Sequence, residues 1–177
     1  MSTPSAQLFV FVSGNLACVR IVGRANFTSS IDFKLLVNEL FAKGFTCFVL
    51  DLSECVLMDS TFLGVLAGLA LKMREPQYRN GHEKQIELLN PNARNLESLE
   101  SLGVLHLFKV LNCGDRLPAE LTQQETAPAA TPTREEVTRT CLDAHKLLME
   151  LSPANISKFK EVTQFLAEDL KKLKSGG

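Results

Sequence analysis

The sequence predicts an α/β domain with a mixed, mostly parallel β-sheet and helices packed on it, followed by a C-terminal helical hairpin. Strand-like and helix-like patterns alternate over residues 6–113, a proline-containing stretch follows at 114–133, and helical periodicity returns over 134–174. Strands that alternate with helices are typical of βαβ units, whose crossovers make neighbouring strands parallel. We therefore expect an α/β domain at 6–113, a linker at 114–133 and the hairpin at 134–174.

Composition restricts the class of protein. The 177 residues are 45% hydrophobic and 22% charged, as in soluble globular proteins. Nineteen basic and twenty acidic residues give a net charge of −1, so we expect no nucleic-acid partner. The longest apolar run, Phe62–Leu71, is shorter than the roughly 20 residues of a membrane span. With no signal-peptide pattern at the N-terminus, these features predict a cytoplasmic protein without a membrane partner.

The cysteines and histidines suggest no cofactor and no metal site. The five cysteines are odd in number and lack C-x-x-C spacing, and the three histidines are far apart in the sequence. Disulfide frameworks and zinc sites need regular spacings of these residues. We interpret the cysteines as small apolar side chains of a reduced protein.

The domain is expected to open with a β-hairpin. Gln7–Val12 and Leu16–Val22 are rich in Val, Phe and Ile, with the turn Ser13-Gly14-Asn15 between them, and Gly23 is expected to end the second strand. A helix should then start at the capping residues Thr28-Ser29-Ser30.

Further strands and helices follow in alternation. Lys43-Gly44 closes the first helix, because glycine is favoured just past a helix end. The continuous apolar run Phe45–Leu52 indicates a strand buried on both faces. The predicted order, β-β-α-β-α-β-α-β, is completed by Thr61–Arg74 (helix), Gln85–Leu89 (strand), Pro91–Leu102 (helix) and Leu105–Leu111 (strand).

Residues 134–174 should form two helices with a tight connection at Ser152-Pro153. Each helix carries one apolar stripe that must be buried. The stripes can pack on the α/β domain or on a second copy of the chain, which would make a homodimer through 134–174. The sequence does not choose between these two arrangements.

The segment Asp51–Leu66 is the one that indicates a function. A buried strand ends at Asp51, and Asp59 and Ser60 start a strongly apolar helix. Either residue could simply cap that helix. Alternatively, Ser60 could carry a phosphoryl group, because helix N-termini favour anions. The added dianion would lie beside Asp59 and repel a docked partner without unfolding the domain.

This segment resembles the STAS domain family, in particular the bacterial anti-sigma-factor antagonists. The family pattern of an apolar strand, Asp-Leu-Ser, a loop and Met-Asp-Ser-Ser/Thr-x-Leu-Gly-Val-Leu is matched by Asp51-Leu52-Ser53 and by Met58–Leu66. The turn at Val22–Asn26 and the order of elements are also similar. The resemblance covers 6–113 and not the hairpin. The family commonly has Asp at Asn26 and a small residue at Phe62.

The resemblance implies a partner-switching regulator with no enzymatic activity. An anti-sigma factor that is also a serine protein kinase would bind the unphosphorylated chain and phosphorylate Ser60, with Thr61 as the alternate acceptor. A serine phosphatase would reverse this step. The implied partner-binding residues are Asn26, Asp59, Ser60, Thr61, Phe62, Leu63 and Gly64.

Three alternatives remain at this stage. The chain could be a STAS scaffold or a subunit of a sensor complex that oligomerises through its C-terminal helices. It could be an enzyme with Ser60 as nucleophile, although no histidine lies near Ser60 in the sequence. The hairpin could also regulate binding by covering the Ser60 surface.

Overall fold

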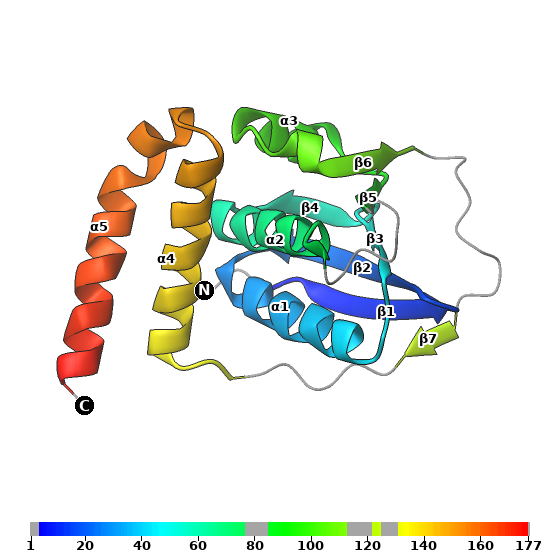
Figure 1. Ribbon diagram of the computed structural model, residues 1–177, viewed down its shortest axis with the longest axis horizontal. Coiled ribbons are helices and arrows are strands. Elements are labelled where there is room, and N and C mark those ends of the chain that lie inside the picture. Colours follow the sequence, from blue (N-terminus) through cyan, green and yellow to red (C-terminus); the bar gives the residue numbers. More distant parts are fainter. Residues whose placement is uncertain (1–3, 77–84, 113–121, 125–130, 177) are drawn as a thin grey trace.

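A mixed β-sheet with helices α1 and α2 packed on one face forms the centre of the computed structural model, which describes residues 4–76, 85–112, 122–124 and 131–176 (Figure 1). The described strands are β1 (Gln7–Ser13), β2 (Leu16–Ala25), β3 (Cys47–Asp51), β4 (Cys55–Met58), β5 (Ile86–Leu89), β6 (Phe108–Leu111) and β7 (Thr122–Gln124). The described α-helices are α1 (Phe27–Ala42), α2 (Ser60–Met73), α3 (Ala93–Ser101), α4 (Arg134–Leu151) and α5 (Ala154–Ser175).

The strand order confirms the predicted α/β class. The sheet runs β6-β5-β3-β2-β1-β7, with β4 paired to β2 off this path. The pairs β2–β3, β3–β5 and β5–β6 are parallel, whereas β1 is antiparallel to both β2 and β7. The strands β1 and β7 therefore add antiparallel pairings at one side of a parallel sheet.

The second strand is longer than predicted, because Gly23 does not end it. Gly23 adopts a φ of 100°, which glycine reaches without strain, and the pairing register shifts between Gly23 and Arg24. Beyond this irregularity β2 pairs with β4, a strand that the sequence did not predict. The last predicted strand, Leu105–Leu111, is also shorter in the structure: Leu105–Leu107 form a 3₁₀ turn, and only Phe108–Leu111 form β6.

The first helix begins at Phe27, before the predicted capping residues Thr28-Ser29-Ser30. Asn26 is its N-cap: the Asn26 side chain accepts hydrogen bonds from the amides of Thr28 and Ser29. The Ser29 hydroxyl accepts in turn from the Asn26 amide, which completes a capping box. Asn26 is thus fixed at the start of α1.

The main core lies between the sheet and its covering helices. Side chains alternate along β2, so that Val19 and Ile21 point into this core while Cys18 lies in a small second cluster with Val49 and Leu89. Phe62 of α2 is fully buried in the main core. Its ring packs on Phe33 of α1, with ring centroids 5.0 Å apart.

The C-terminal helices pack on the α/β domain of the same chain, which is one of the two arrangements that the sequence left open. Helix α4 lies across α1 and α2, and α5 packs on α4 (Figure 1). The buried Asn155 amide donates to the carbonyls of Leu102 and Leu148, linking the hairpin connection to the domain. No helix among the described residues is long and apolar enough to cross a membrane.

Most of the predicted linker at 114–133 lies outside the described residues. Its described part includes β7, which pairs with β1. Its last residue, Thr133, caps α4 by accepting a hydrogen bond from the Glu136 amide, and the Glu136 carboxylate accepts from the Thr133 amide.

Candidate functional site

Asp59 caps α2 and joins it to the start of α1. One carboxylate oxygen accepts from the Phe62 amide of α2 and the other from the Phe27 amide of α1, both at 2.8 Å. Burial raises the pKa of Asp59, and the hydrogen bonds from these two amides work against that rise. Of the two residues predicted to cap α2, Asp59 is therefore the N-cap. The Ser60 side chain makes a different contact.

The Ser60 hydroxyl forms a hydrogen bond with His145 of α4. Ser60 Oγ lies 2.8 Å from His145 Nε2, and His145 Nδ1 lies 2.6 Å from the carbonyl oxygen of Cys141. Because a carbonyl only accepts, Nδ1 carries a proton, and Nε2 of a neutral ring is then the acceptor. With the ring neutral, the Ser60 hydroxyl is the donor of this hydrogen bond. The His145 ring also packs on the ring of Phe159 from α5.

Helix α4 packs on the side of α2 that carries Thr61 and Gly64. Thr61 is 5% exposed, and its hydroxyl lies 3.6 Å from the Cys141 sulfur. Gly64 lies against Ala144 so closely that an added Cβ would stand 2.6 Å from the Ala144 carbonyl oxygen. In this arrangement α4 covers the side of α2 on which the sequence places partner contacts.

The structure divides the seven predicted partner-binding residues into three sets. Asn26, Asp59 and Ser60 lie together where α1 and α2 begin, and Ser5 also donates to the Asn26 side chain at 3.2 Å. Thr61 and Gly64 face α4. The side chains of Phe62 and Leu63 are 0% and 2% exposed, because the apolar face of α2 turns them into the core. Those two side chains cannot reach a docked partner while the core is intact.

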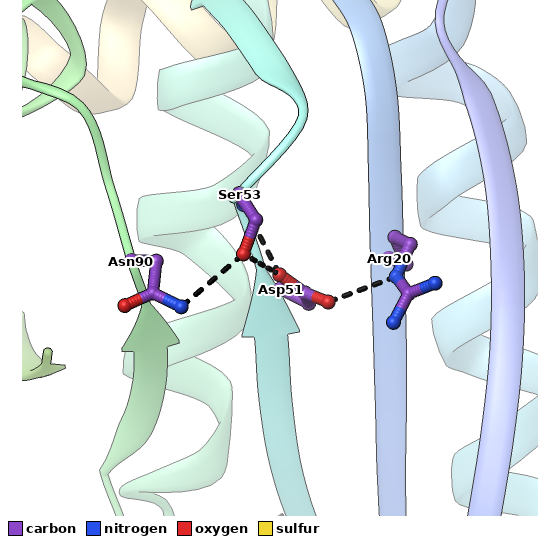
Figure 2. Close-up of polar contacts among 4 residues, drawn as sticks. All are labelled: Arg20, Asp51, Ser53 and Asn90. Carbon is purple, nitrogen blue, oxygen red and sulfur yellow. Dashed lines mark hydrogen bonds and ion pairs between the residues drawn. The ribbon is translucent and has the colours of Figure 1, made fainter. Parts of the chain in front are cut away.

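A second polar cluster holds the chain between β3 and α2 (Figure 2). Asp51 is buried at the end of β3, where one carboxylate oxygen accepts from Arg20 Nε at 2.8 Å. The other accepts from the Ser53 hydroxyl at 2.6 Å and the Ser53 amide at 3.1 Å. Asn90, directly after β5, donates to the Ser53 hydroxyl at 3.3 Å.

Asp51 is held in its charged form by this cluster. Burial raises the pKa of Asp51, but the two Ser53 hydrogen bonds and the Arg20 guanidinium outweigh it and hold the pKa below its ordinary value. The Asp-Leu-Ser part of the motif therefore orients the turn at Leu52–Glu54, from which β4 and then Ser60 follow.

His145 is the residue that sequence reasoning missed. Its position gives the signal that could have found it: it lies four residues after Cys141 and three before Leu148, on the stripe of α4 predicted to be buried. A histidine on a buried stripe needs polar partners for its ring nitrogens. The sequence does not show that the partner is Ser60, 85 residues earlier.

A groove lies beside this contact, between α1, α2 and α4. Its volume is about 270 Å³, and its lining includes Phe33, Gly64, Gly68, Ala144 and Leu147. Neither Ser60 nor His145 lines it.

Comparisons with known proteins define the fold. No protein-family model and no curated protein sequence matches the chain. A solved structure from Thermotoga maritima, described as a candidate anti-sigma factor antagonist, matches with a TM-score of 0.50 and 18% identity, over 60% of this chain and 87% of that one. The anti-sigma factor antagonist SpoIIAA in its unphosphorylated form matches with a TM-score of 0.50 and 19% identity, over 63% and 90%. These matches confirm the predicted STAS-like fold.

Proposed function

We propose that this protein is an anti-sigma-factor antagonist that acts by partner switching. It binds an anti-sigma factor with serine kinase activity while Ser60 is unphosphorylated, and releases it when Ser60 carries a phosphoryl group. A serine phosphatase restores binding. The observation that carries the proposal is the position of Ser60, in the first turn of α2 beside the start of α1, on a fold shared with two solved antagonists.

The local geometry supports a switch on binding rather than on folding. A phosphoryl group adds about 1.5–2 negative charges, which the N-terminal end of α2 stabilises through its dipole. The Asp59 carboxylate accepts from Phe62 and Phe27 and stays in place. The added charge therefore falls on the shared surface of α1 and α2, where it repels a docked partner and leaves the core unchanged.

Substitution of Ser60 tests this proposal. We expect a kinase partner to add one phosphoryl group to the wild-type chain and none to Ser60→Ala, as measured by intact mass. Ser60→Ala should stay bound to the partner in the presence of ATP. Ser60→Asp should bind at least tenfold more weakly, because the introduced carboxylate lies beside Asp59.

The matched control is Ser157→Asp, the same change at an exposed position on α5. It should bind like the wild type in a titration with the purified partner. If Ser60→Asp and Ser157→Asp bind equally well, Ser60 is not the switch. A mass increase that persists in Ser60→Ala would instead move the acceptor to another hydroxyl, with Thr61 the first to examine.

A scaffold function is the alternative, and one observation favours it. Ile156, Val162 and Phe165 are exposed apolar residues on α5, and Phe165 is 67% exposed. Val162 and Phe165 are three positions apart and therefore neighbours on the surface of α5, and adjacent exposed apolar side chains are typical of contact with another chain. A scaffold would self-associate through these residues, and its binding would not respond to Ser60→Asp.

The Ser60–His145 pair calls for one further assay, because a serine hydroxyl that donates to an imidazole is also the arrangement of an activated nucleophile. We expect no turnover of activated ester substrates beyond that of Ser60→Ala, since His145 Nδ1 contacts a backbone carbonyl and not the carboxylate that stabilises an imidazolium in a catalytic triad. Turnover that Ser60→Ala abolishes would show that the protein is an enzyme and would contradict the proposed function.

A further inference from the structure

The hairpin of α4 and α5 covers the surface that the proposed function assigns to the partner. We infer that it is an autoinhibitory cap: α4 docked on α2 and phosphorylation of Ser60 exclude each other, and α4 must leave before a partner or kinase reaches Ser60. This inference rests on the proposed function for the identity of Ser60 as the phosphorylated residue. The exclusion itself follows from contacts within the chain.

The first contact is the close approach of α4 to α2 at Gly64. A Cβ at Gly64 would stand 2.6 Å from the Ala144 carbonyl oxygen, 2.7 Å from Ala144 Cβ and 2.9 Å from its carbonyl carbon. Backbone atoms account for two of these three contacts, so no side-chain rotation relieves them. The small residues at 64 and 144 therefore allow the two helices to touch, and any larger residue at 64 must push α4 away.

The second contact joins the hydroxyl that would be phosphorylated to α4. The His145 ring lies 2.8 Å from Ser60 Oγ, and it is held from behind by the Cys141 carbonyl and by Phe159, whose ring centroid is 4.9 Å away. A phosphoryl group on Oγ would replace the hydroxyl proton that a neutral His145 ring accepts, so phosphorylation removes this hydrogen bond. While α4 is docked, Ser60 is half-buried, and the imidazole narrows the approach of a kinase to Oγ.

The two contacts couple the modification to the hairpin in both directions. Docking of α4 disfavours the phosphorylated state of Ser60, and a phosphoryl group on Ser60 lowers the population of docked α4 by the same free energy.

Amide hydrogen exchange on the full chain tests the inference without a partner protein. We expect Gly64→Ala to speed exchange of the α4 amides, residues 134–151, at least tenfold, because the new methyl group displaces α4. Ser60→Asp should act in the same direction. The amides of β3 and β5 should exchange as in the wild type, which shows that the domain remains folded. The substitution itself does not weaken α2, because alanine favours the helical state over glycine.

Gly68→Ala is the matched control, since it makes the same change one turn further along α2. Its Cβ would meet only Leu147 Cδ2, at 3.2 Å, and the end of a leucine side chain can move aside. Exchange of α4 should therefore stay within about threefold of the wild type in this variant. Equal exchange of α4 in Gly64→Ala and Gly68→Ala, or slower exchange in Ser60→Asp than in the wild type, would overturn the inference.

The outcome separates the inference from the proposed function. Faster exchange of α4 in Gly64→Ala and Ser60→Asp supports the cap even if no kinase modifies Ser60. Phosphorylation of Ser60 with unchanged exchange of α4 supports the proposed function and contradicts the cap.

Discussion

Replacement of Phe62 by alanine is expected to lower the free energy of unfolding by about 3–5 kcal/mol, the usual cost of removing a buried aromatic ring. The Phe62 side chain is fully buried, and its ring packs on Phe33 across the contact between α1 and α2. Its removal leaves a cavity between the helices that carry the candidate site. Urea unfolding followed by circular dichroism measures the loss.

Phe165→Ala is the control for this experiment, because it makes the same substitution in another helix where the ring is exposed. Its effect should lie within about 0.5 kcal/mol of zero. If Phe62→Ala lowers the free energy of unfolding by less than about 1 kcal/mol, the position of Phe62 in the core is contradicted. Phe62 would then again be a candidate for partner binding.

Replacement of Asp51 by asparagine is expected to cost about 2–3 kcal/mol at neutral pH. The amide keeps the shape of the carboxylate but loses its charge beside Arg20, and its NH₂ group cannot accept the hydrogen bond that the carboxylate oxygen now takes. The variant should also lose part of the acid sensitivity of the wild type. Unfolding curves collected between pH 2 and pH 7 measure both effects.

The direction of the pH effect follows from the lowered pKa of Asp51 in the folded protein. A carboxylate with a lowered folded pKa stabilises the protein above its unfolded pKa of about 3.9, and this stabilisation is lost as pH falls through the folded pKa. Asp143→Asn, at an exposed carboxylate on α4, is the control and should change stability by at most about 0.5 kcal/mol. A flat wild-type profile in this range would contradict the ion pair with Arg20.

Local patterns in the sequence were sufficient to predict the elements that build the parallel sheet. The apolar run ending at Leu52 is β3, the apolar helix after Asp59 is α2, and the break at Ser152-Pro153 separates α4 from α5. Each of these signals lies within about ten residues, which is why the sequence shows them. The motif from Asp51 to Leu66 likewise indicated where the candidate site lies.

Contacts between distant segments could not be predicted in the same way. Strand β4 forms by pairing with the part of β2 that continues past Gly23. Strand β7 forms because residues 122–124 pair with the edge of β1. The covering of Ser60 requires Ala144 to fit against Gly64, and nothing in either local pattern shows that the two helices meet. Burial of Phe62 depends on the same packing of helices on the sheet.

The pairing of β7 with β1 limits how far the hairpin can travel. Residues 125–133 connect β7 to α4, and nine extended residues span at most about 30 Å. A detached α4 therefore remains tethered near its docking face, at a local concentration on the order of millimolar. The affinity measured for any partner is then reduced in proportion to the fraction of molecules that are open, so shortening or cutting this tether is a way to tune the response threshold of the protein.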